Sequence, residues 1–223
     1  MPVLARVPKT PFTSVMKDRP EPLSPQIAIG FAPEERQTAA LLFWSAFRGK
    51  LWRLLAPEAR AVAFIADVLS PDHAISARAS DGTLLGLAGF KTGRGGLVGG
   101  GLRDLARVYG WPGALWREPL LALLERRVEP GVLLMDGIFV AEEARGRGVG
   151  TALLSAVKSH AVAVGADAVR LDVVDSNQRA KALYLREGFV PTGNEDLGVM
   201  RHVLGFRRST RMIWHSRAGG AGR

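Results

Sequence analysis

The chain has 223 residues, of which 47% are hydrophobic and 23% charged, so it can bury a full core and global disorder is excluded. It contains no cysteine, which excludes disulfide bonds, thiolate metal sites and cysteine nucleophiles. Its four histidines lie on separate segments without metal-ligand spacing, so no metal ion is expected.

Neither a membrane span nor a secretory signal is expected. The longest strongly apolar stretch, near residues 39–47, is far shorter than the roughly 20 residues that cross a bilayer. Residues 1–10 lack the long apolar core of a secretory signal, so a cytoplasmic location is predicted.

The net charge of +9 is distributed unevenly along the chain. Residues 201–223 carry six arginines and no acidic residue, whereas residues 26–200 are close to neutral. An excess at one end indicates a solvated basic tail, predicted to be flexible over residues 215–223, rather than a nucleic-acid-binding surface. A basic-tailed regulator that binds nucleic acid is therefore kept only as a minor alternative.

The predicted elements begin after a proline-rich, irregular arm at residues 1–25. Hydrophobic periodicity and turn residues next predict a strand, two helices and a two-stranded hairpin. The hairpin turn is assigned to Asp81-Gly82, because this dipeptide readily adopts the positive φ of a tight turn. In chain order these elements cover residues 26–31, 38–55, 57–69, 73–80 and 83–92.

A long segment between two predicted strands, residues 93–131, is interpreted as an insertion into the domain. Its first part, residues 93–101, is glycine-rich and is expected to form neither helix nor strand. Its second part, residues 102–127, has helical character with an interruption at Trp111-Pro112-Gly113. A lid, a dimer contact and a membrane-surface segment are all left open as roles for the insertion.

The remaining chain alternates strands with helices and carries the densest pattern. A buried strand is predicted at Val132–Val140, and a mixed α/β domain over residues 26–214. After that strand come a helix, a strand, a second helix and two more strands. They are predicted at residues 148–164, 168–174, 177–187, from 188 onward, and 206–214.

The segment from Arg145 to Thr151, between the buried strand and the following helix, has the features of an anion site. Its glycines let the backbone approach a ligand, and the first helical turn presents unpaired N–H groups at the positive end of the helix dipole. Arg145 and Arg147 add positive charge suited to phosphate oxygens.

Three phosphate-binding patterns compete for this loop. A Walker A loop requires Lys and then Ser or Thr after its last glycine, but Thr151 and Ala152 follow Gly150. A dinucleotide fingerprint requires G-x-G-x-x-G, whereas the glycines here are spaced G-x-G-x-G. The third pattern, R-x-x-G-x-G at Arg145, Gly148 and Gly150, resembles the acetyl-CoA pyrophosphate loop of the GNAT superfamily.

A second block strengthens this resemblance. Downstream lie a strand, Asn177, a helix with Ala180 and Tyr184, and then Gly188-Phe189, an order similar to the second GNAT motif. A glycine-softened connector between strand and helix would explain the first block alone but not both. The chain is therefore identified as a member of the GNAT superfamily.

The resemblance implies a mixed sheet of about six to seven mostly antiparallel strands whose central strands splay apart. About four helices would flank the sheet, with the insertion added. It implies acetyl-CoA as acyl donor in the gap between the splayed strands, and direct attack of an amine on the thioester. The implied cofactor-binding residues are Ile138, Phe139, Val140, Arg145, Gly146, Arg147, Gly148, Val149, Gly150, Thr151, Asn177 and Ala180.

The resemblance also implies catalytic roles. Tyr184 matches the general acid that protonates the leaving thiolate, and a backbone N–H at Ile138 or Phe139 would polarise the thioester carbonyl. Strict alternation along the strand predicts that Asp136 shares a face with Ile138, which makes it the first candidate for the base. Asp172 is the reserve candidate, and a water chain is a further possibility.

Each of these residues also has a structural interpretation. Tyr184 could instead pack on the sheet, and Asp136 could form a strand-end hydrogen bond or ion pair. The acceptor is left open between a small-molecule amine and a protein amine, as is a homodimer. A non-catalytic module that binds acyl-CoA is the main alternative function.

Overall fold

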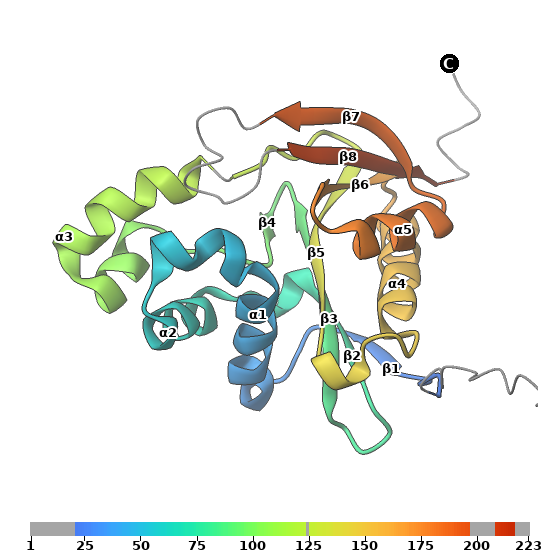
Figure 1. The fold of residues 1–223 in the computed structure, drawn as a ribbon, viewed down its shortest axis with the longest axis horizontal. Coiled ribbons are helices and arrows are strands. Elements are labelled where there is room, and N and C mark those ends of the chain that lie inside the picture. Colours follow the sequence, from blue (N-terminus) through green and yellow to red (C-terminus); the bar gives the residue numbers. More distant parts are fainter. Residues whose placement is uncertain (1–20, 124, 197–207, 217–223) are drawn as a thin grey trace, which may run out of the picture.

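The computed structural model describes residues 21–123, 125–196 and 208–216. These residues form a mixed sheet covered by helices on both faces (Figure 1). The strands are β1 (Gln26–Ile29), β2 (Ala74–Arg78), β3 (Leu84–Thr92), β4 (Gly95–Gly96), β5 (Val132–Val140), β6 (Ala168–Val174), β7 (Val190–Asp196) and β8 (Arg208–His215). The helices are α1 (Arg36–Leu55), α2 (Glu58–Val68), α3 (Leu102–Ala122), α4 (Val149–Ala163) and α5 (Gln178–Arg186).

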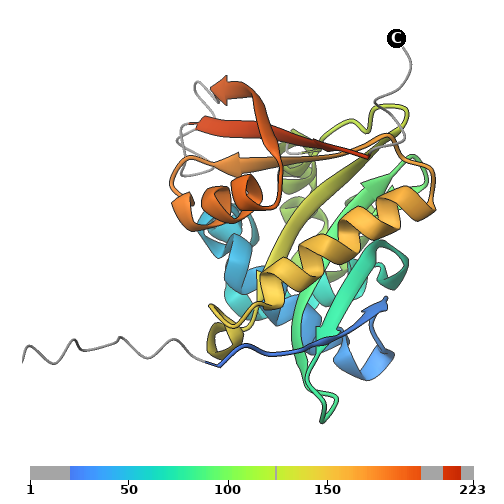
Figure 2. The ribbon, with the colours of Figure 1, turned by 90° about the vertical axis from the view of Figure 1, so that its right-hand side faces the viewer.

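The centre of the sheet is split. The strand order is β1-β2-β3-β5-β6-β8-β7, with β4 paired to β3, and among the described strands only β5 and β6 pair in parallel. That parallel pair joins Val132–Leu134 to Ala168–Arg170, after which β5 follows β3 and β6 follows β8 (Figures 1 and 2). The predicted α/β fold with mostly antiparallel, centrally splayed strands is confirmed.

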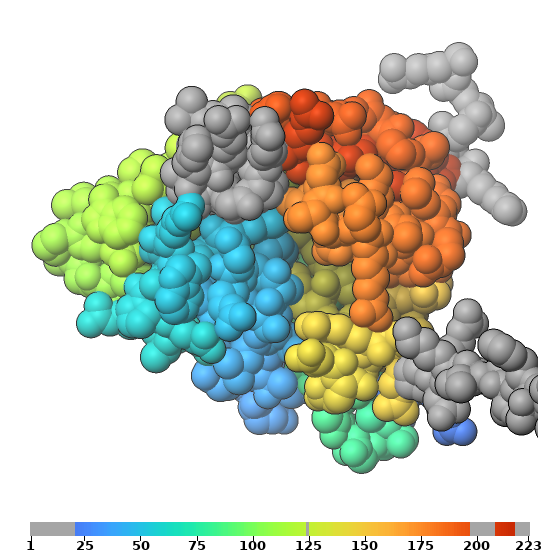
Figure 3. All heavy atoms as spheres, viewed as in Figure 1, coloured from blue at the N-terminus to red at the C-terminus, as the bar shows by residue number. Residues whose placement is uncertain are grey.

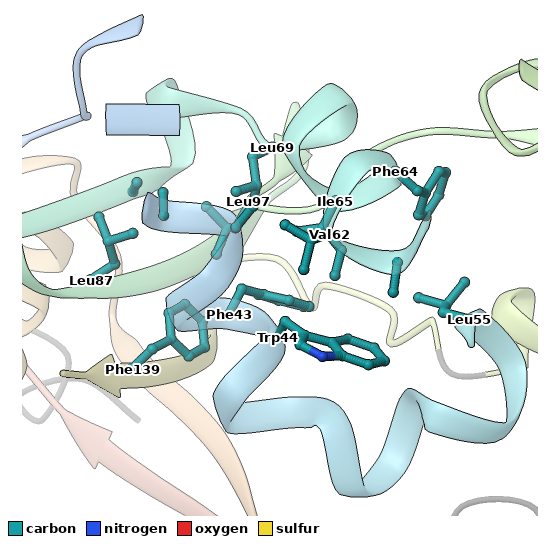
Figure 4. Close-up of a cluster of buried hydrophobic side chains, with 14 of the residues drawn as sticks. Phe43, Trp44, Leu55, Val62, Phe64, Ile65, Leu69, Leu87, Leu97 and Phe139 are labelled. Atoms are coloured by element: carbon teal, nitrogen blue, oxygen red, sulfur yellow. The ribbon is translucent and has the colours of Figure 1, made fainter. Parts of the chain in front are cut away.

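Two separate apolar cores lie on the two faces of the sheet. Figure 2 shows α4 across one face, with α1 and α2 on the other. On the α1 face, Phe139 points from β5 toward Phe43 and Trp44 of α1 (Figure 4). On the α4 face, Val149, Leu153, Leu154, Val157 and Ala161 are buried at helical spacing. Because both faces are covered, β5 reads as an unbroken apolar run apart from Asp136 and Gly137.

The predicted insertion packs on the end of α1. The hydroxyl of Tyr109 donates a 2.5 Å hydrogen bond to the backbone oxygen of Leu55. Arg117 Nε donates a 2.7 Å bond to the oxygen of Leu54, so α3 satisfies carbonyls that a helix end leaves unpaired. The helix breaks at Gly110, whose φ is 72°, one residue before the predicted interruption.

Two boundary expectations were wrong. Residues 93–101 were expected to form no strand, but Gly95–Gly96 pairs with Lys91 and Thr92 as β4. The basic tail was expected to begin at residue 215, but His215 ends β8 and Ser216 is buried, its N–H donating 2.9 Å to the oxygen of Asp167. The first arises from a local turn between Thr92 and Gly95, and the second depends on a contact with the distant Asp167. Residues 217–223 and His202 lie outside the described residues.

Close approach of β3 to β5 requires glycine at position 86. A Cβ on Gly86 would lie 2.7 Å from the backbone oxygen of Phe139, closer than real Cβ contacts come. We expect Gly86→Ala to lower the free energy of unfolding by about 1–3 kcal/mol, because the strand pair must shift to admit the methyl group.

The matched control is Gly49→Ala, in α1. No atom lies within 4 Å of a Cβ at that position, so it should raise the free energy of unfolding by about 0.5–1 kcal/mol. Urea denaturation measures both variants. Equal effects would show that β3 and β5 do not approach this closely.

Candidate active site

The loop before α4 presents backbone donors at the positive end of a helix. Gly146 and Gly148 have φ values of 80° and 89°, a backbone conformation that favours glycine. Gly148 caps α4, and the first intrahelical bond runs from the N–H of Ala152 to the oxygen of Gly148 at 3.0 Å. The N–H groups of Val149 to Thr151 therefore have no helical partner and, with the helix dipole, form a candidate anion site.

Both predicted phosphate-binding arginines also shape this loop. Arg145 Nε donates a 3.1 Å hydrogen bond to the oxygen of Val140. Arg147 Nε donates 3.0 Å to the oxygen of Glu21, and the N–H of Leu23 donates 2.8 Å to the oxygen of Arg147. The described end of the N-terminal arm thus lies beside the loop.

The register of β5 decides which backbone groups face the gap. The N–H of Ala141 donates a 2.9 Å bond to the oxygen of Leu85 on the side of β3. Because an antiparallel ladder alternates, the backbone groups of Phe139 also point toward β3, and those of Ile138 and Val140 point away from it. Of the two predicted N–H donors, Ile138 therefore faces the gap, and Phe139 does not.

Asp136 interrupts the alternation along β5. Gly89 and Phe90 of β3 face Gly137 and Met135, which leaves Asp136 as the extra residue of a β-bulge. Met135 packs in the same core as Ile138 although strict alternation would separate them. The expectation that Asp136 alternates regularly onto the face of Ile138 was wrong, because sequence spacing cannot reveal a bulge.

The environment of Asp136 favours a stronger base than an ordinary carboxylate. Burial raises the pKa of its carboxyl, and the nearby charges of Lys91, Arg126 and His73 act against this shift. A hydrogen bond from the backbone N–H of Leu97 also acts against it. Leu97 packs in the core on the α1 face, so the carboxyl lies on the side of the sheet opposite α4.

Asn177 and Ala180 form the start of α5. Asn177 caps this helix, its Oδ1 accepting a 3.1 Å hydrogen bond from the N–H of Ala180. Gly150 of α4 packs against α5, because a Cβ added to Gly150 would lie 3.4 Å from Leu183 Cδ2. The two predicted motifs therefore meet through the contact of α4 with α5.

Tyr184 is the buried residue of α5, and its ring centroid lies 6.0 Å from that of Phe189. Burial raises the pKa of its phenol to about 12. The ring packs as the structural interpretation expected, and the phenol stays protonated at neutral pH, as an acid must be. Its role as general acid stays a prediction.

Asp172 lies across the gap on β6 within a cluster of cations. Its side chain is only 1% exposed, and Arg126 Nη1 lies 2.6 Å from its Oδ2. Arg170 and Arg211 approach to 3.9 and 4.0 Å, yet among the described residues neither carboxylate oxygen receives a well-directed hydrogen bond. Arg170 is also paired with Glu129, and Arg211 with Glu195.

Two residues near Asp172 were not predicted from the sequence. They are Lys50, near the end of α1, and Arg126, and Lys50 interacts electrostatically with both Arg126 and Asp172. Burial, and then the charge of Arg126, lowers the pKa of its ammonium group to about 8, while Asp172 acts in the opposite direction. No motif surrounds Lys50 or Arg126, so only the folded arrangement brings them to the site.

Figure 3 shows a hollow between α1, the loop before α4 and α5, with β5 at its floor. The predicted pyrophosphate loop lies at one margin of this hollow.

Within the described helices none is long and apolar enough to cross a membrane. Across residues 21–123, 125–196 and 208–216, no group of three or more histidine, aspartate or glutamate side chains could hold a metal ion.

Comparison with known families identifies the fold. The model of the Acetyltransferase (GNAT) family matches residues 40–189, more than half of the chain. The chain belongs to this family. A curated relative, the uncharacterized N-acetyltransferase YhfO of Bacillus subtilis (strain 168), is 33% identical over 73 residues. That match covers 33% of this chain and less than half, 46%, of YhfO.

Solved structures of GNAT proteins share the fold at low identity. A GCN5-related N-acetyltransferase from Kribbella flavida is 19% identical, with a TM-score of 0.58 over 86% of this chain and 98% of that one. A phosphinothricin acetyltransferase from Sinorhizobium meliloti, solved with AcCoA, is 14% identical, with a TM-score of 0.56 over 90% and 93%. An acetyltransferase from Bacillus subtilis, solved with CoA, is 16% identical, with a TM-score of 0.52 over 86% and 99%.

The chain has two tyrosines, Tyr109 and Tyr184, and burial raises the pKa of each to about 12. We therefore expect almost no tyrosinate absorbance at pH 10 in the folded protein. Between pH 10 and 12 the folded protein binds more protons than the unfolded chain, so stability falls as pH rises through this range.

Ultraviolet difference spectroscopy during alkaline titration measures this directly, and Tyr109→Phe isolates the signal of Tyr184. A tyrosine that titrates near pH 10 while circular dichroism still reports a folded protein would contradict the burial of that phenol.

Proposed function

We propose that the protein transfers an acetyl group from acetyl-CoA to an amine acceptor. The observation that carries this proposal is the joint placement of two features: the open edge of β5 at Ile138 and Val140, and the unpaired donors that begin α4. An extended arm can pair with the strand edge while a pyrophosphate binds the helix end. Membership of the GNAT family supports acyl transfer as the reaction class.

The residues at the helix end suit the donor's phosphates. Backbone N–H groups of Val149, Gly150 and Thr151 would bind the pyrophosphate oxygens, with Arg145 and Arg147 adding charge. The backbone of Ile138 and Val140 would pair with the pantetheine arm. Asn177, whose Oδ1 already caps α5, would have its side-chain amide N–H left for this arm.

Thr151 offers a test that separates helix stability from phosphate binding. It is exposed in the first turn of α4, where a carboxylate stabilises a helix through the dipole. We expect Thr151→Glu to retain or raise thermal stability, yet to weaken acetyl-CoA binding by about tenfold or more through repulsion of the pyrophosphate.

Calorimetric titration with acetyl-CoA measures the affinities, and Thr151→Gln is the neutral control of similar shape. Equal affinity in the two variants would place the pyrophosphate elsewhere. Failure of the folded wild type to bind acetyl-CoA at all would refute the proposed function.

The chemistry then needs a neutral amine and a protonated leaving group. Asp136, whose pKa is raised by burial, would accept the amine proton, directly or through water. The N–H of Ile138 would stabilise negative charge that develops on the thioester oxygen. Tyr184 would donate a proton to the departing sulfur, since its phenol is neutral at working pH.

Removing the Tyr184 hydroxyl tests this role. We expect Tyr184→Phe to lower kcat by about 10²–10⁴-fold, with acetyl-CoA affinity and melting temperature nearly unchanged because the ring still packs. Release of the CoA thiol with a panel of small amines and peptide amines measures the rate and narrows the acceptor. An unchanged kcat would leave Tyr184 a structural residue only.

A further inference from the structure

Lys50 reaches the gap between β5 and β6 from the helix that covers the face opposite α4. Its ammonium nitrogen lies 5.2 Å from the ring centroid of Phe47. That ring lies 5.5 Å from the ring of Phe139, and a Cβ on Gly137 would lie only 3.1 Å from Phe47 Cζ. The amine is thereby placed over the part of β5 that has already separated from β6.

Interactions with β6, on the other side of the gap, also indicate where the Lys50 amine lies. Asp172 of β6 and Arg126 are among the charged groups that act on Lys50. Asp172 lies two residues beyond Arg170, the last β6 residue that pairs with β5. The packing of its neighbour Phe47 on β5 and the electrostatic interaction with Asp172 of β6 therefore place Lys50 near the gap.

This position is on the side from which an acceptor would approach. The proposed pyrophosphate site lies at the start of α4, on the far face of the sheet, while α1 covers the near face. Asp136, the proposed base, also has its carboxyl on the α1 side, beside Leu97. The amine of Lys50 and the proposed base Asp136 therefore lie on the same face of the sheet, beside the open edge of β5.

The charge state of Lys50 matches what the reaction requires. Because burial and Arg126 lower its pKa to about 8, the neutral amine is far more populated near neutral pH than in an ordinary lysine. An ordinary lysine would be neutral in only about one molecule in a thousand. The chain thus carries a nucleophile of the kind that the proposed reaction consumes.

We propose that Lys50 is an internal acyl acceptor, so that the protein acetylates itself at this residue from donor bound in its own site. The inference rests on the proposed function. The Nζ–C bond of an amide forms as the C–S bond of the thioester breaks. Nζ loses one proton, by way of Asp136 or water, and the departing sulfur gains one, so no oxidant or further reactant is needed.

Acetylation would change the electrostatics of the acceptor side. It removes one positive charge beside Arg126, leaving the ion pair of Arg126 with Asp172 next to a neutral amide. The added acetyl group would also occupy space at the mouth of the gap. Self-acetylation would therefore reduce the access of external amines.

The test incubates the purified, full chain with acetyl-CoA and follows intact mass and peptide maps over time. We expect Lys50 to be acetylated at least about tenfold faster than any other lysine, at a rate independent of protein concentration, as an intramolecular reaction requires. Lys50→Arg keeps the charge and should abolish this modification. Lys158→Arg, on α4, is the matched control and should not affect it.

Thr151→Glu separates templated from chemical acetylation, because it should suppress modification of Lys50 without changing slow background labelling elsewhere. Calorimetry on the same samples reports donor binding. If acetyl-CoA binds but Lys50 reacts no faster than Lys158, or at a rate proportional to protein concentration, the inference is overturned while the proposed function stands. If acetyl-CoA does not bind, both fail.

Discussion

The separation of β5 from β6 is the constraint on which the candidate site depends. The two strands pair over three residues each, and each then follows its outer neighbour. Backbone N–H and C=O groups along the freed edge of β5, at Ile138 and Val140, lose a strand partner inside the sheet rather than at its margin. The oxygen of Val140 accepts a hydrogen bond from Arg145 Nε, and an extended ligand arm can pair with other groups along this edge.

Packing on the α1 face and pairing with the outer strands hold β5 and β6 apart. On the α1 face, the rings of Phe43, Phe47 and Phe139 form a cluster with centroids 4.7–5.5 Å apart that ties β5 to α1. Close approach at Gly86 ties the same strand to β3. On the other side of the gap, β6 pairs with β8 along its whole length. β5 therefore stays with β3 and α1, and β6 stays with β8.

The two sides of the gap differ in electrostatics, and the proposed placement of donor and acceptor depends on this difference. The α4 side offers a helix N-terminus with glycine-shaped backbone and two arginines, which suits a polyanionic donor. The α1 side offers Asp136 and Asp172 together with Lys50 and Arg126, so carboxylates and cations are mixed there. A buried lysine in that setting has a lowered pKa, and an amine with a lowered pKa is a better nucleophile at neutral pH.

The sequence by itself determined the local elements and the family. The limits of Val132–Val140 and Ala168–Val174 match the structure, because a run of apolar residues bounded by turn residues specifies a buried strand locally. The loop from Arg145 to Thr151 was also predictable, since its glycines and its place before a helix are local features.

Only the tertiary structure decided how these elements face one another. The bulge at Asp136 and the choice of Ile138 over Phe139 depend on the register with β3, which no single strand encodes. Lys50 and Arg126 meet Asp172 from segments far apart in the chain, so their electrostatic interactions and the lowered pKa of Lys50 arise only on folding. Non-local contacts of this kind leave no periodic or spacing signal in the sequence, and for that physical reason the α1 side of the gap could not be predicted from it.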